Sequence, residues 1–260
     1  MTGTNLKYKK PLLKLSGEMF GGKEGFGFDR SSLEGFAKEI KAVVDAGITP
    51  GIVIGGGNFF RGAKSTLPAV KRHNADSIGM LATVMNALCF ADHLEAVGVK
   101  TAVFSAMPIG TLTRPYDIDK AQKFLNKGIV CIFSAGTGHP YFSTDTGSAL
   151  RAIETGCDVL VKATKVDGVY DADPAKVPTA KKFDVITYEE VLDKKLGVMD
   201  LVAITLCRDN SMPLKVLSLN ESGILVKACR GEKVGTDVVT DIKWNVKTEN
   251  WKVIVQRSSS

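Results

Sequence analysis

The residues best able to do chemistry in this sequence lie in three glycine-rich segments, each directly after an apolar run. The segments are Lys14-Leu15-Ser16-Gly17, Gly55-Gly56-Gly57-Asn58 and Ala135-Gly136-Thr137-Gly138. Glycine turns between a strand and a helix leave backbone N–H groups free, and these groups together with the helix dipole attract anions. Lys14 and Arg61 can add positive charge beside phosphate oxygens. The pattern predicts a site for a phosphorylated ligand.

Neither of the two common glycine motifs for nucleotide phosphates fits these segments. Gly17, Gly22 and Lys23 have the spacing of a P-loop, but Glu24 stands where that loop needs a serine or threonine for Mg²⁺. The dinucleotide fingerprint would need a glycine in place of Phe60. The sequence therefore predicts a phosphate site of another kind.

Two longer loops carry groups that suit a whole nucleotide. Residues 135–145 combine backbone amides, hydroxyls and two aromatic rings before a helix that Asp145 is predicted to cap. In residues 162–174, Lys162 and Lys165 can meet phosphates and Tyr170 can stack on a base. Structural explanations stay open beside these: a Gly-Pro loop before a helix, a solvated charged turn, and, for Lys14, a chain that merely reaches solvent.

Strands and helices alternate between these loops. Predicted strands cover 12–15, 51–54, 100–104, 129–133, 159–161, 214–218 and 237–240, several as unbroken apolar runs that suit parallel strands. Predicted helices run from Ser31 or Ser32 to Val44, from Asp76 to Val97, from Asp145 to about Thr155, and from a capping box at 187–190. This order predicts a three-layer α/β/α sandwich with a mainly parallel central sheet. We expect one domain over residues 1–241 and a C-terminal extension over 242–260.

Composition narrows the class of protein. The 260 residues are 44% hydrophobic and 24% charged, which is typical of a globular chain, and no apolar run approaches the length of a membrane span. The five cysteines sit in apolar surroundings without metal-ligand spacing, which favours a reducing compartment. The net charge of +6 comes from scattered lysines, so nucleic-acid binding is not expected. We expect a cytoplasmic protein without a membrane or nucleic-acid partner.

The ordered set of motifs resembles the bacterial uridylate kinases, a branch of the amino acid kinase superfamily. The matching segments are 13–18 (LKLSGE), 53–58 (VIGGGN) with 60–62 (FRG), 79–86 (GMLATVMN), 134–138 (SAGTG), 162–169 (KATKVDGV), 173–174 (DP) and 198–201 (VMDL). The similarity covers roughly residues 8–240. It implies an amino acid kinase-like fold, transfer of the γ-phosphoryl of ATP to UMP in pyrimidine nucleotide biosynthesis, Mg²⁺ bound with ATP, and a homohexamer.

The resemblance also implies roles for individual residues. UMP would be held by Gly56, Asp76, Thr137, Gly138, His139, Pro140, Tyr141, Phe142, Ser143 and Thr144. ATP would be surrounded by Lys14, Leu15, Ser16, Gly17, Gly57, Arg61, Thr164, Tyr170 and Asp173. Phosphoryl transfer needs positioning and charge neutralisation rather than a covalent nucleophile. We therefore expect Lys14 to neutralise charge, Arg61 to bridge the donor and acceptor phosphates, and Asp145 and Asp200 to orient Lys14 or Mg²⁺ and its waters.

Two other functions stay open at this point. The loops shared by the whole superfamily would also suit a kinase with a carboxylate or carbamate acceptor, and only the helix from Asp76 and the segment 137–145 resemble the UMP branch. A non-catalytic pyrimidine-nucleotide sensor that binds a protein or DNA is the second alternative. Lys14, Arg61 and Asp145 together speak against an inactive protein.

Overall fold

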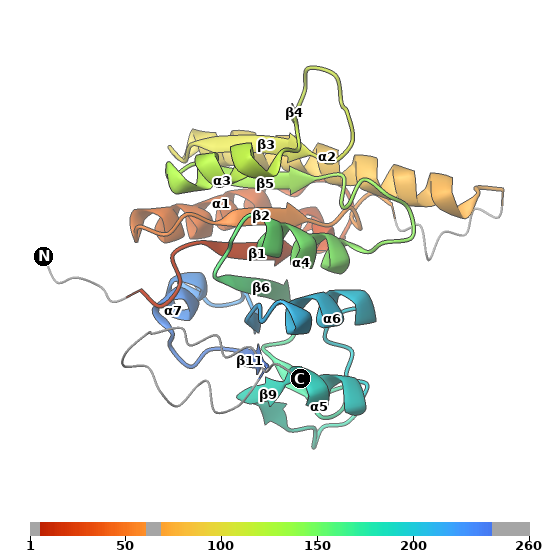
Figure 1. Ribbon diagram of the computed structural model, residues 1–260, viewed down its shortest axis with the longest axis vertical. Coiled ribbons are helices and arrows are strands. Elements are labelled where there is room, and N and C mark those ends of the chain that lie inside the picture. The colour runs from red at the N-terminus through yellow and green to blue at the C-terminus, as the bar shows by residue number, and fades with distance from the viewer. Residues whose placement is uncertain (1–5, 61–68, 241–260) are drawn as a thin grey trace, which may run out of the picture.

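A nine-stranded sheet forms the centre of the computed structural model, which describes residues 6–60 and 69–240 (Figure 1). The strand order is β4-β3-β5-β2-β1-β6-β10-β11-β9, and within it only the pair β10–β11 is antiparallel. The strands are β1 (Pro11–Leu15), β2 (Gly51–Ile54), β3 (Thr101–Ser105), β4 (Arg114–Pro115), β5 (Val130–Ser134), β6 (Val159–Thr164), β9 (Val185–Thr187), β10 (Leu214–Ser218) and β11 (Thr236–Val239). A separate antiparallel pair consists of β7 (Val169–Tyr170) and β8 (Lys182–Phe183). The predicted mainly parallel sheet is confirmed.

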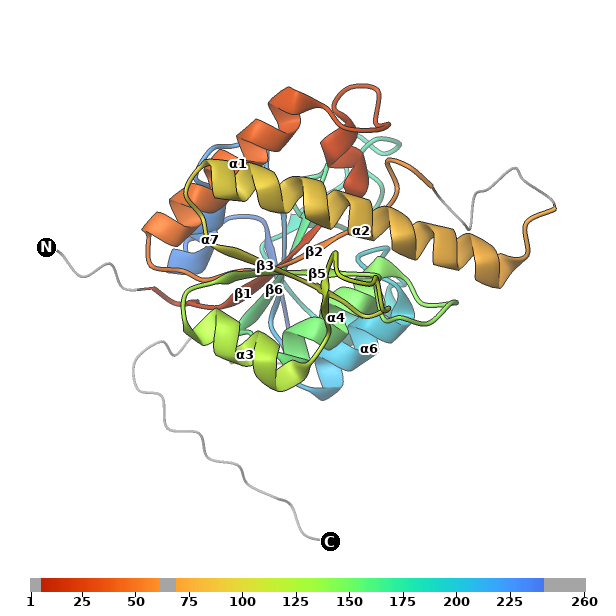
Figure 2. The same cartoon turned by 90° about the horizontal axis from the view of Figure 1, so that it is seen from above.

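Helices cover both faces of this sheet (Figure 2). On one face lie α1 (Arg30–Asp45), α2 (Arg72–Ala96) and α7 (Ile224–Arg230), with the short 3-10 helix η1 (Gly17–Gly21). On the other lie α3 (Ile118–Asn126), α4 (Thr144–Glu154), α5 (Tyr188–Asp193) and α6 (Leu201–Asp209). Leu13 and Leu12 of β1 belong to different core clusters, one on each face. Burial on both faces explains the unbroken apolar runs and confirms the three-layer sandwich.

Three helix starts differ from those predicted. Asp29, not Ser31 or Ser32, caps α1, and its carboxylate accepts a hydrogen bond from the N–H of Ser32 at 2.8 Å. Helix α2 begins at Arg72, so Asp76 lies inside the helix. Ser143 caps α4, and the predicted Asp145 cap is wrong. Several capping residues stand close together in each segment, and propensity alone does not choose among them. The capping box Thr187–Glu190 before α5 is confirmed.

Helix α2 is the one helix of the described residues that is long and apolar enough to cross a membrane by length and composition. Half of the most apolar stretch of this helix is buried inside the protein, and the helix contacts α1, β3 and β5. Its buried face carries the polar residues Thr83 and Asn86. These features are those of a core helix that also holds loops in place.

Candidate active site

Four loops meet at one edge of the sheet. Strands β5, β2, β1 and β6 are neighbours in this order, and each adjacent pair is parallel. Parallel strands end at the same edge, where open α/β sheets bind their ligands. The three glycine-rich segments and the loop after Thr164 are therefore brought together, although they are far apart in the sequence.

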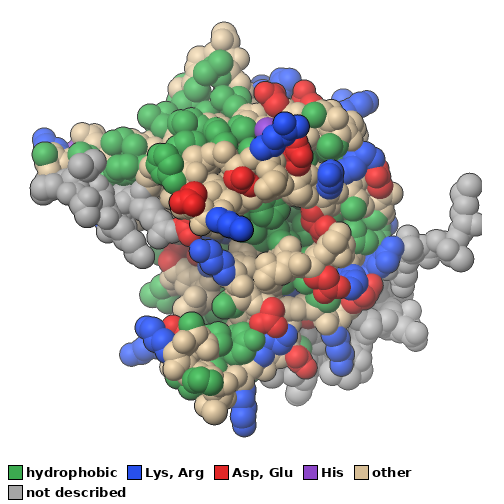
Figure 3. Space-filling view, turned by 180° about the vertical axis from the view of Figure 1, so that it is seen from behind, with side chains coloured by type: hydrophobic (Ala, Val, Ile, Leu, Met, Phe, Trp, Pro, Cys, Tyr) green, Lys and Arg blue, Asp and Glu red, His purple; other side chains and the backbone are tan. Residues whose placement is uncertain are grey.

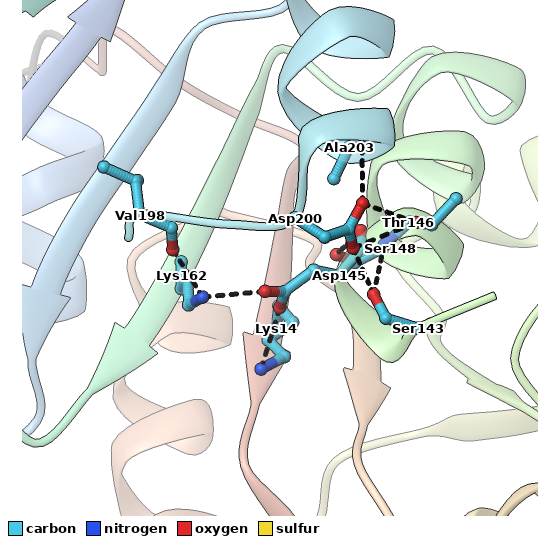
Figure 4. A network of polar contacts seen from close by, with 9 residues as sticks. All are labelled: Lys14, Ser143, Asp145, Thr146, Ser148, Lys162, Val198, Asp200 and Ala203. Carbon is cyan, nitrogen blue, oxygen red and sulfur yellow. Dashed lines mark hydrogen bonds and ion pairs between the residues drawn. The ribbon is translucent and has the colours of Figure 1, made fainter. Parts of the chain in front are cut away.

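Two lysines and one carboxylate form a compact charged cluster at this edge (Figure 4). Nζ of Lys14, on β1, lies 3.0 Å from Oδ1 of Asp145, and these side chains are 13% and 16% exposed. Nζ of Lys162, on β6, lies 2.8 Å from Oδ2 of Asp145 and donates to the carbonyl oxygen of Val198 at 2.6 Å. Two cations and one anion leave a net positive charge. This Lys14–Asp145–Lys162 cluster suits an anionic phosphoryl group.

The pKa values in the cluster reflect burial opposed by charge. Burial raises the pKa of Asp145, but the nearby ammonium groups of Lys14 and Lys162 outweigh burial and hold it below its ordinary value. Burial lowers the pKa of Lys162, while Asp145 opposes that shift and Lys14 adds to it. An ionised Asp145 therefore pairs with both lysines, and its predicted role in orienting Lys14 for a reaction stays a prediction.

Asp200 contacts two helix ends instead of Lys14. Its carboxylate caps α6 by accepting from the N–H of Ala203 at 2.9 Å, and it accepts the hydroxyl hydrogen bonds of Ser143 and Thr146 from the start of α4. Ser143 in turn caps α4. Asp200 thus fixes the turn that carries Asp145 (Figure 4). Its proposed part in the reaction stays a prediction.

Two pockets lie on either side of the cluster. The first, about 400 Å³, contains seven of the ten residues predicted for the acceptor: Gly56, Asp76, Thr137, Tyr141, Phe142, Ser143 and Thr144. The second, about 540 Å³, contains Thr164, Tyr170 and Asp173, all predicted for the nucleotide donor. Lys162 lines the second pocket, and Asp145 directly follows Thr144 of the first. The cluster therefore joins the two pockets.

Some predicted residues have other surroundings. Gly57 was expected on the donor side but lines the first pocket. Leu15 is a core residue with 1% exposure, so only its backbone is available to a ligand. Gly138, His139 and Pro140 belong to the loop of the first pocket without lining it, and Ser16 and Gly17 follow β1 next to Lys14. Arg61 lies outside the described residues.

Asp76 ties helix α2 to the loop of the first pocket. Its carboxylate accepts from the backbone N–H of Tyr141 at 2.8 Å and from Nε of Arg72 at 2.9 and 3.0 Å. The guanidinium of Arg72 also lies over the Tyr141 ring, 5.6 Å from its centre. Tyr141 has φ of 71°, a left-handed conformation that is uncommon for a tyrosine and needs such support.

The sequence model of the amino acid kinase family matches residues 9–218. The chain belongs to the amino acid kinase family. It is 52% identical to the uridylate kinase of Stutzerimonas stutzeri over 91% of this chain and 96% of that protein, and 52% identical to the uridylate kinase of Pseudomonas fluorescens over 90% and 95%. Among solved structures, the UMP kinase of Bacillus anthracis aligns with a TM-score of 0.87 at 37% identity, over 90% of this chain and 97% of that chain.

Glycines of this amino acid kinase allow the loops to touch one another. A Cβ atom on Gly17 would lie 2.2 Å from the carbonyl oxygen of Gly55, and one on Gly56 would lie 2.6 Å from that of Gly79 in α2. Such distances leave no room for any side chain. The glycine-rich segments therefore serve the packing of loop on loop and loop on helix, in addition to any contact with phosphate.

A buried amide pair holds these loops, and the residue patterns did not assign it a role. Asn58 and Asn86 donate to each other's side-chain oxygens at 2.9 and 2.7 Å. Asn86 also donates to the carbonyl oxygen of Gly55 at 2.7 Å, and Asn58 donates to that of Gly27 at 2.8 Å. An asparagine on the buried face of an apolar helix is the signal that could have revealed it, since buried amides need partners.

We expect Asn86→Ala to lower the free energy of unfolding by about 2–4 kcal/mol, because the Asn58 side chain loses both of its bonds to Asn86 and the Gly55 carbonyl loses its donor. Urea denaturation of the variant and the parent measures this difference. Asn210→Ala is the matched control, since Asn210 is exposed and donates only to the Leu206 carbonyl at the end of α6. Its expected change is below about 0.5 kcal/mol. Equal small losses in both variants would contradict a structural role for the amide pair.

Proposed function

We propose that this protein transfers the γ-phosphoryl group of ATP to UMP, giving UDP and ADP. The observation that carries the proposal is the Lys14–Asp145–Lys162 cluster between two pockets, which places positive charge where a phosphoryl group would pass from one ligand to the other. The uridylate kinases that are about half identical over nearly the whole chain support UMP as the acceptor. We place UMP in the first pocket and ATP in the second.

The chain's own residues would act mainly by position and charge. Lys14 and Lys162 would neutralise charge on the transferring phosphoryl oxygens, and Asp145 would hold both ammonium groups in place. Arg61 is proposed to bridge the two phosphates. Tyr170, at the rim of the second pocket, donates from its hydroxyl to Asp167 at 2.6 Å, so its ring is held for stacking on a base.

Mg²⁺ is proposed to enter with ATP. In residues 6–60 and 69–240 no group of three or more His, Cys, Asp or Glu side chains gathers into a cation site. The carboxylates of Asp145 and Asp200 already face lysines, hydroxyls and N–H groups. Their chemistry fits a cation held mostly by ATP phosphates and water, with these carboxylates nearby. Bound there, Mg²⁺ would neutralise charge on the phosphates.

A panel of acceptors tests the proposed function. ADP release would be measured with ATP and, in turn, UMP, CMP, AMP, N-acetylglutamate, aspartate and carbamate. UMP should give by far the highest kcat/KM. Faster ADP release with a carboxylate or carbamate acceptor would favour the other branches of the family, and binding of nucleotides without turnover would favour a sensor.

We expect Asp76→Asn to weaken UMP binding about tenfold or more and to leave ATP binding nearly unchanged, because the carboxylate both supports the Tyr141 loop and faces the first pocket. Calorimetric titrations with each nucleotide measure the two affinities. Asp92→Asn, an exposed residue on the same helix, is the control and should change neither. Equal losses of UMP and ATP affinity would contradict the assignment of Asp76 to the acceptor.

We propose assembly into a homohexamer, as the resemblance to uridylate kinases implies, and the surface of α2 supports association between subunits. Ile78, Leu81 and Met85 are 40–48% exposed and follow one another at helical spacing, and hydrophobic side chains also gather on the face shown in Figure 3. Leu112, 65% exposed, lies in the loop before β4. Such apolar patches mark association surfaces.

We further propose that the protein works in the cytoplasm, in pyrimidine nucleotide biosynthesis, without membrane or nucleic-acid partners.

Light scattering at micromolar concentration should therefore give a mass well above 27.9 kDa, the mass of one chain. Leu81→Asp should shift the mass downward, because a buried carboxylate in the interface has no partner. Val177→Asp is the control, since Val177 is also exposed but lies in the loop between β7 and β8. A monomeric parent protein would contradict the proposed assembly.

A further inference from the structure

Thr83 links helix α2 to the loop of the first pocket. The side chain is buried, and its hydroxyl accepts from the backbone N–H of Ala135 at 2.7 Å and donates to the carbonyl oxygen of Met80 at 2.7 Å. Ala135 is fully buried and has φ of 59°, a left-handed conformation that an alanine adopts only when its surroundings impose it. The next two residues, Gly136 and Thr137, line the first pocket. The hydroxyl of Thr83 therefore fixes the turn at Ala135, where the wall of the first pocket formed by Gly136 and Thr137 begins.

Thr236 makes the same kind of link at the second pocket. It lies fully buried in β11, and its hydroxyl accepts from the backbone N–H of Val169 at 2.8 Å and donates to the carbonyl oxygen of Phe183. Val169 and Phe183 face each other in the small sheet β7–β8, so the hydroxyl joins this sheet to the nine-stranded one. Gly168, Val169 and Tyr170 line the second pocket.

Close packing leaves little freedom at the second link. A Cβ atom on Gly168 would lie 2.6 Å from Oγ1 of Thr236, so the loop rests directly on the threonine. Both threonines have an N–H donor and a carbonyl acceptor already bound. Without the hydroxyl, a buried N–H at each pocket wall would lose its partner, and the wall would have to move to recover one.

We propose that Thr83 and Thr236 are positioning residues, Thr83 for the phosphoryl acceptor alone and Thr236 for the nucleotide donor alone. The identity of the two ligands rests on the proposed function, whereas the pairing of each threonine with one pocket rests on the contacts above. Thr83 itself lines the first pocket, but both hydrogen bonds of each hydroxyl end on protein atoms, so each residue acts through the backbone of one wall. Neither contacts the Lys14–Asp145–Lys162 cluster, so the rate of the bound complex should change little.

Steady-state kinetics of valine and serine variants test this division. Valine keeps the shape of threonine and removes the hydroxyl, whereas serine keeps the hydroxyl. Thr83→Val should raise the KM for UMP about tenfold and leave the KM for ATP within about twofold, and Thr236→Val should do the reverse. Thr83→Ser and Thr236→Ser should restore both values. Thr155→Val is the control, since Thr155 is also buried but its hydroxyl contacts only the Arg151 carbonyl at the end of α4 and the sulfur of Cys157, and it should change neither KM.

Equal rises in both KM values, or serine variants that behave like the valine variants, would overturn the proposal. If a valine variant does not fold, the alanine variant at the same position is measured by calorimetric titration with each nucleotide, and the same one-sided loss is expected. The acceptor used by the unmutated protein tests the proposed function separately from this result. A parent that uses another acceptor would refute UMP phosphorylation, and the KM split would then be measured with that acceptor.

Discussion

Replacing Lys14 with methionine should lower kcat by a factor of at least about 10²–10³ while UMP still binds. Methionine keeps much of the length of the side chain and removes the ammonium group that lies 3.0 Å from Asp145. Lys162 would then be the one lysine of the cluster left for the phosphoryl group, and Asp145 would pair with one lysine instead of two. The loss should fall on the rate of transfer, because Lys14 lines neither of the two pockets.

Single-turnover rates and UMP titrations on the folded variant measure the two effects separately. Lys9→Met is the matched control, since Lys9 is an exposed lysine just before the same strand, at the opposite edge of the sheet, and its variant should keep the parent rate. Near-normal transfer by a folded Lys14→Met protein would remove Lys14 from the catalytic group.

Asp145→Asn should reduce both activity and stability. The substitution leaves the ammonium groups of Lys14 and Lys162 next to each other without their counter-charge, in a place where the aspartate is only 16% exposed. We expect kcat to fall by about 10²-fold or more, because Lys14 loses its charged partner and Lys162 keeps only the Val198 carbonyl. The free energy of unfolding should fall by about 3 kcal/mol, since breaking a buried pair leaves a charge uncompensated.

The pH dependence of stability gives a second measurement for Asp145. Its pKa in the folded protein lies below the ordinary value for an aspartate, so its contribution is complete above that ordinary value. The contribution is lost as the pH falls through the folded pKa, because both states are then protonated. Denaturation midpoints between pH 7 and pH 3 should therefore fall less steeply for Asp145→Asn than for the parent. Parallel curves would show that the pair contributes nothing, and Asp193→Asn, an exposed control, should follow the parent.

The sequence predicted that the glycine-rich segments follow strands, and because the structure makes these strands parallel neighbours, the segments meet at their shared carboxyl edge. The sequence also predicted that Asp145 and Asp200 orient Lys14 or Mg²⁺ and its waters, and this stays a prediction, although Asp145 lies 3.0 Å from Lys14. It did not predict that Lys162 completes the cluster, since β6 was expected to end at residue 161 and instead continues to Thr164. Lys14 and Lys162 face the same carboxylate because the register between β1 and β6 places them side by side. No local sequence pattern contains that register.

Other features could not be predicted because their partners are distant in sequence. Several short elements have too few residues to show a clear hydrophobic periodicity: α3, α6, α7, β7 and β8. They are stabilised by packing and by caps such as Asp200. Gly57 was placed with ATP by resemblance, yet it lines the first pocket together with residues of α2. The division into residues 1–241 and 242–260 stays a prediction, and the extension lies outside the described residues.

The contact between Gly17 and Gly55 limits how far such a site can vary. With a Cβ at position 17 only 2.2 Å from a carbonyl oxygen, even alanine would force the loops after β1 and β2 apart by about an ångström or more. Lys14 stands on β1, and the loop of the first pocket follows β5, the neighbour of β2. A displacement of that size in a catalytic site can cost about a hundredfold in rate. Substitutions are therefore tolerated least at these glycine positions, although glycine has no side chain that could contact a ligand. Substitutions that change substrate choice are therefore expected among the residues that line the pockets rather than at the contact between these two loops.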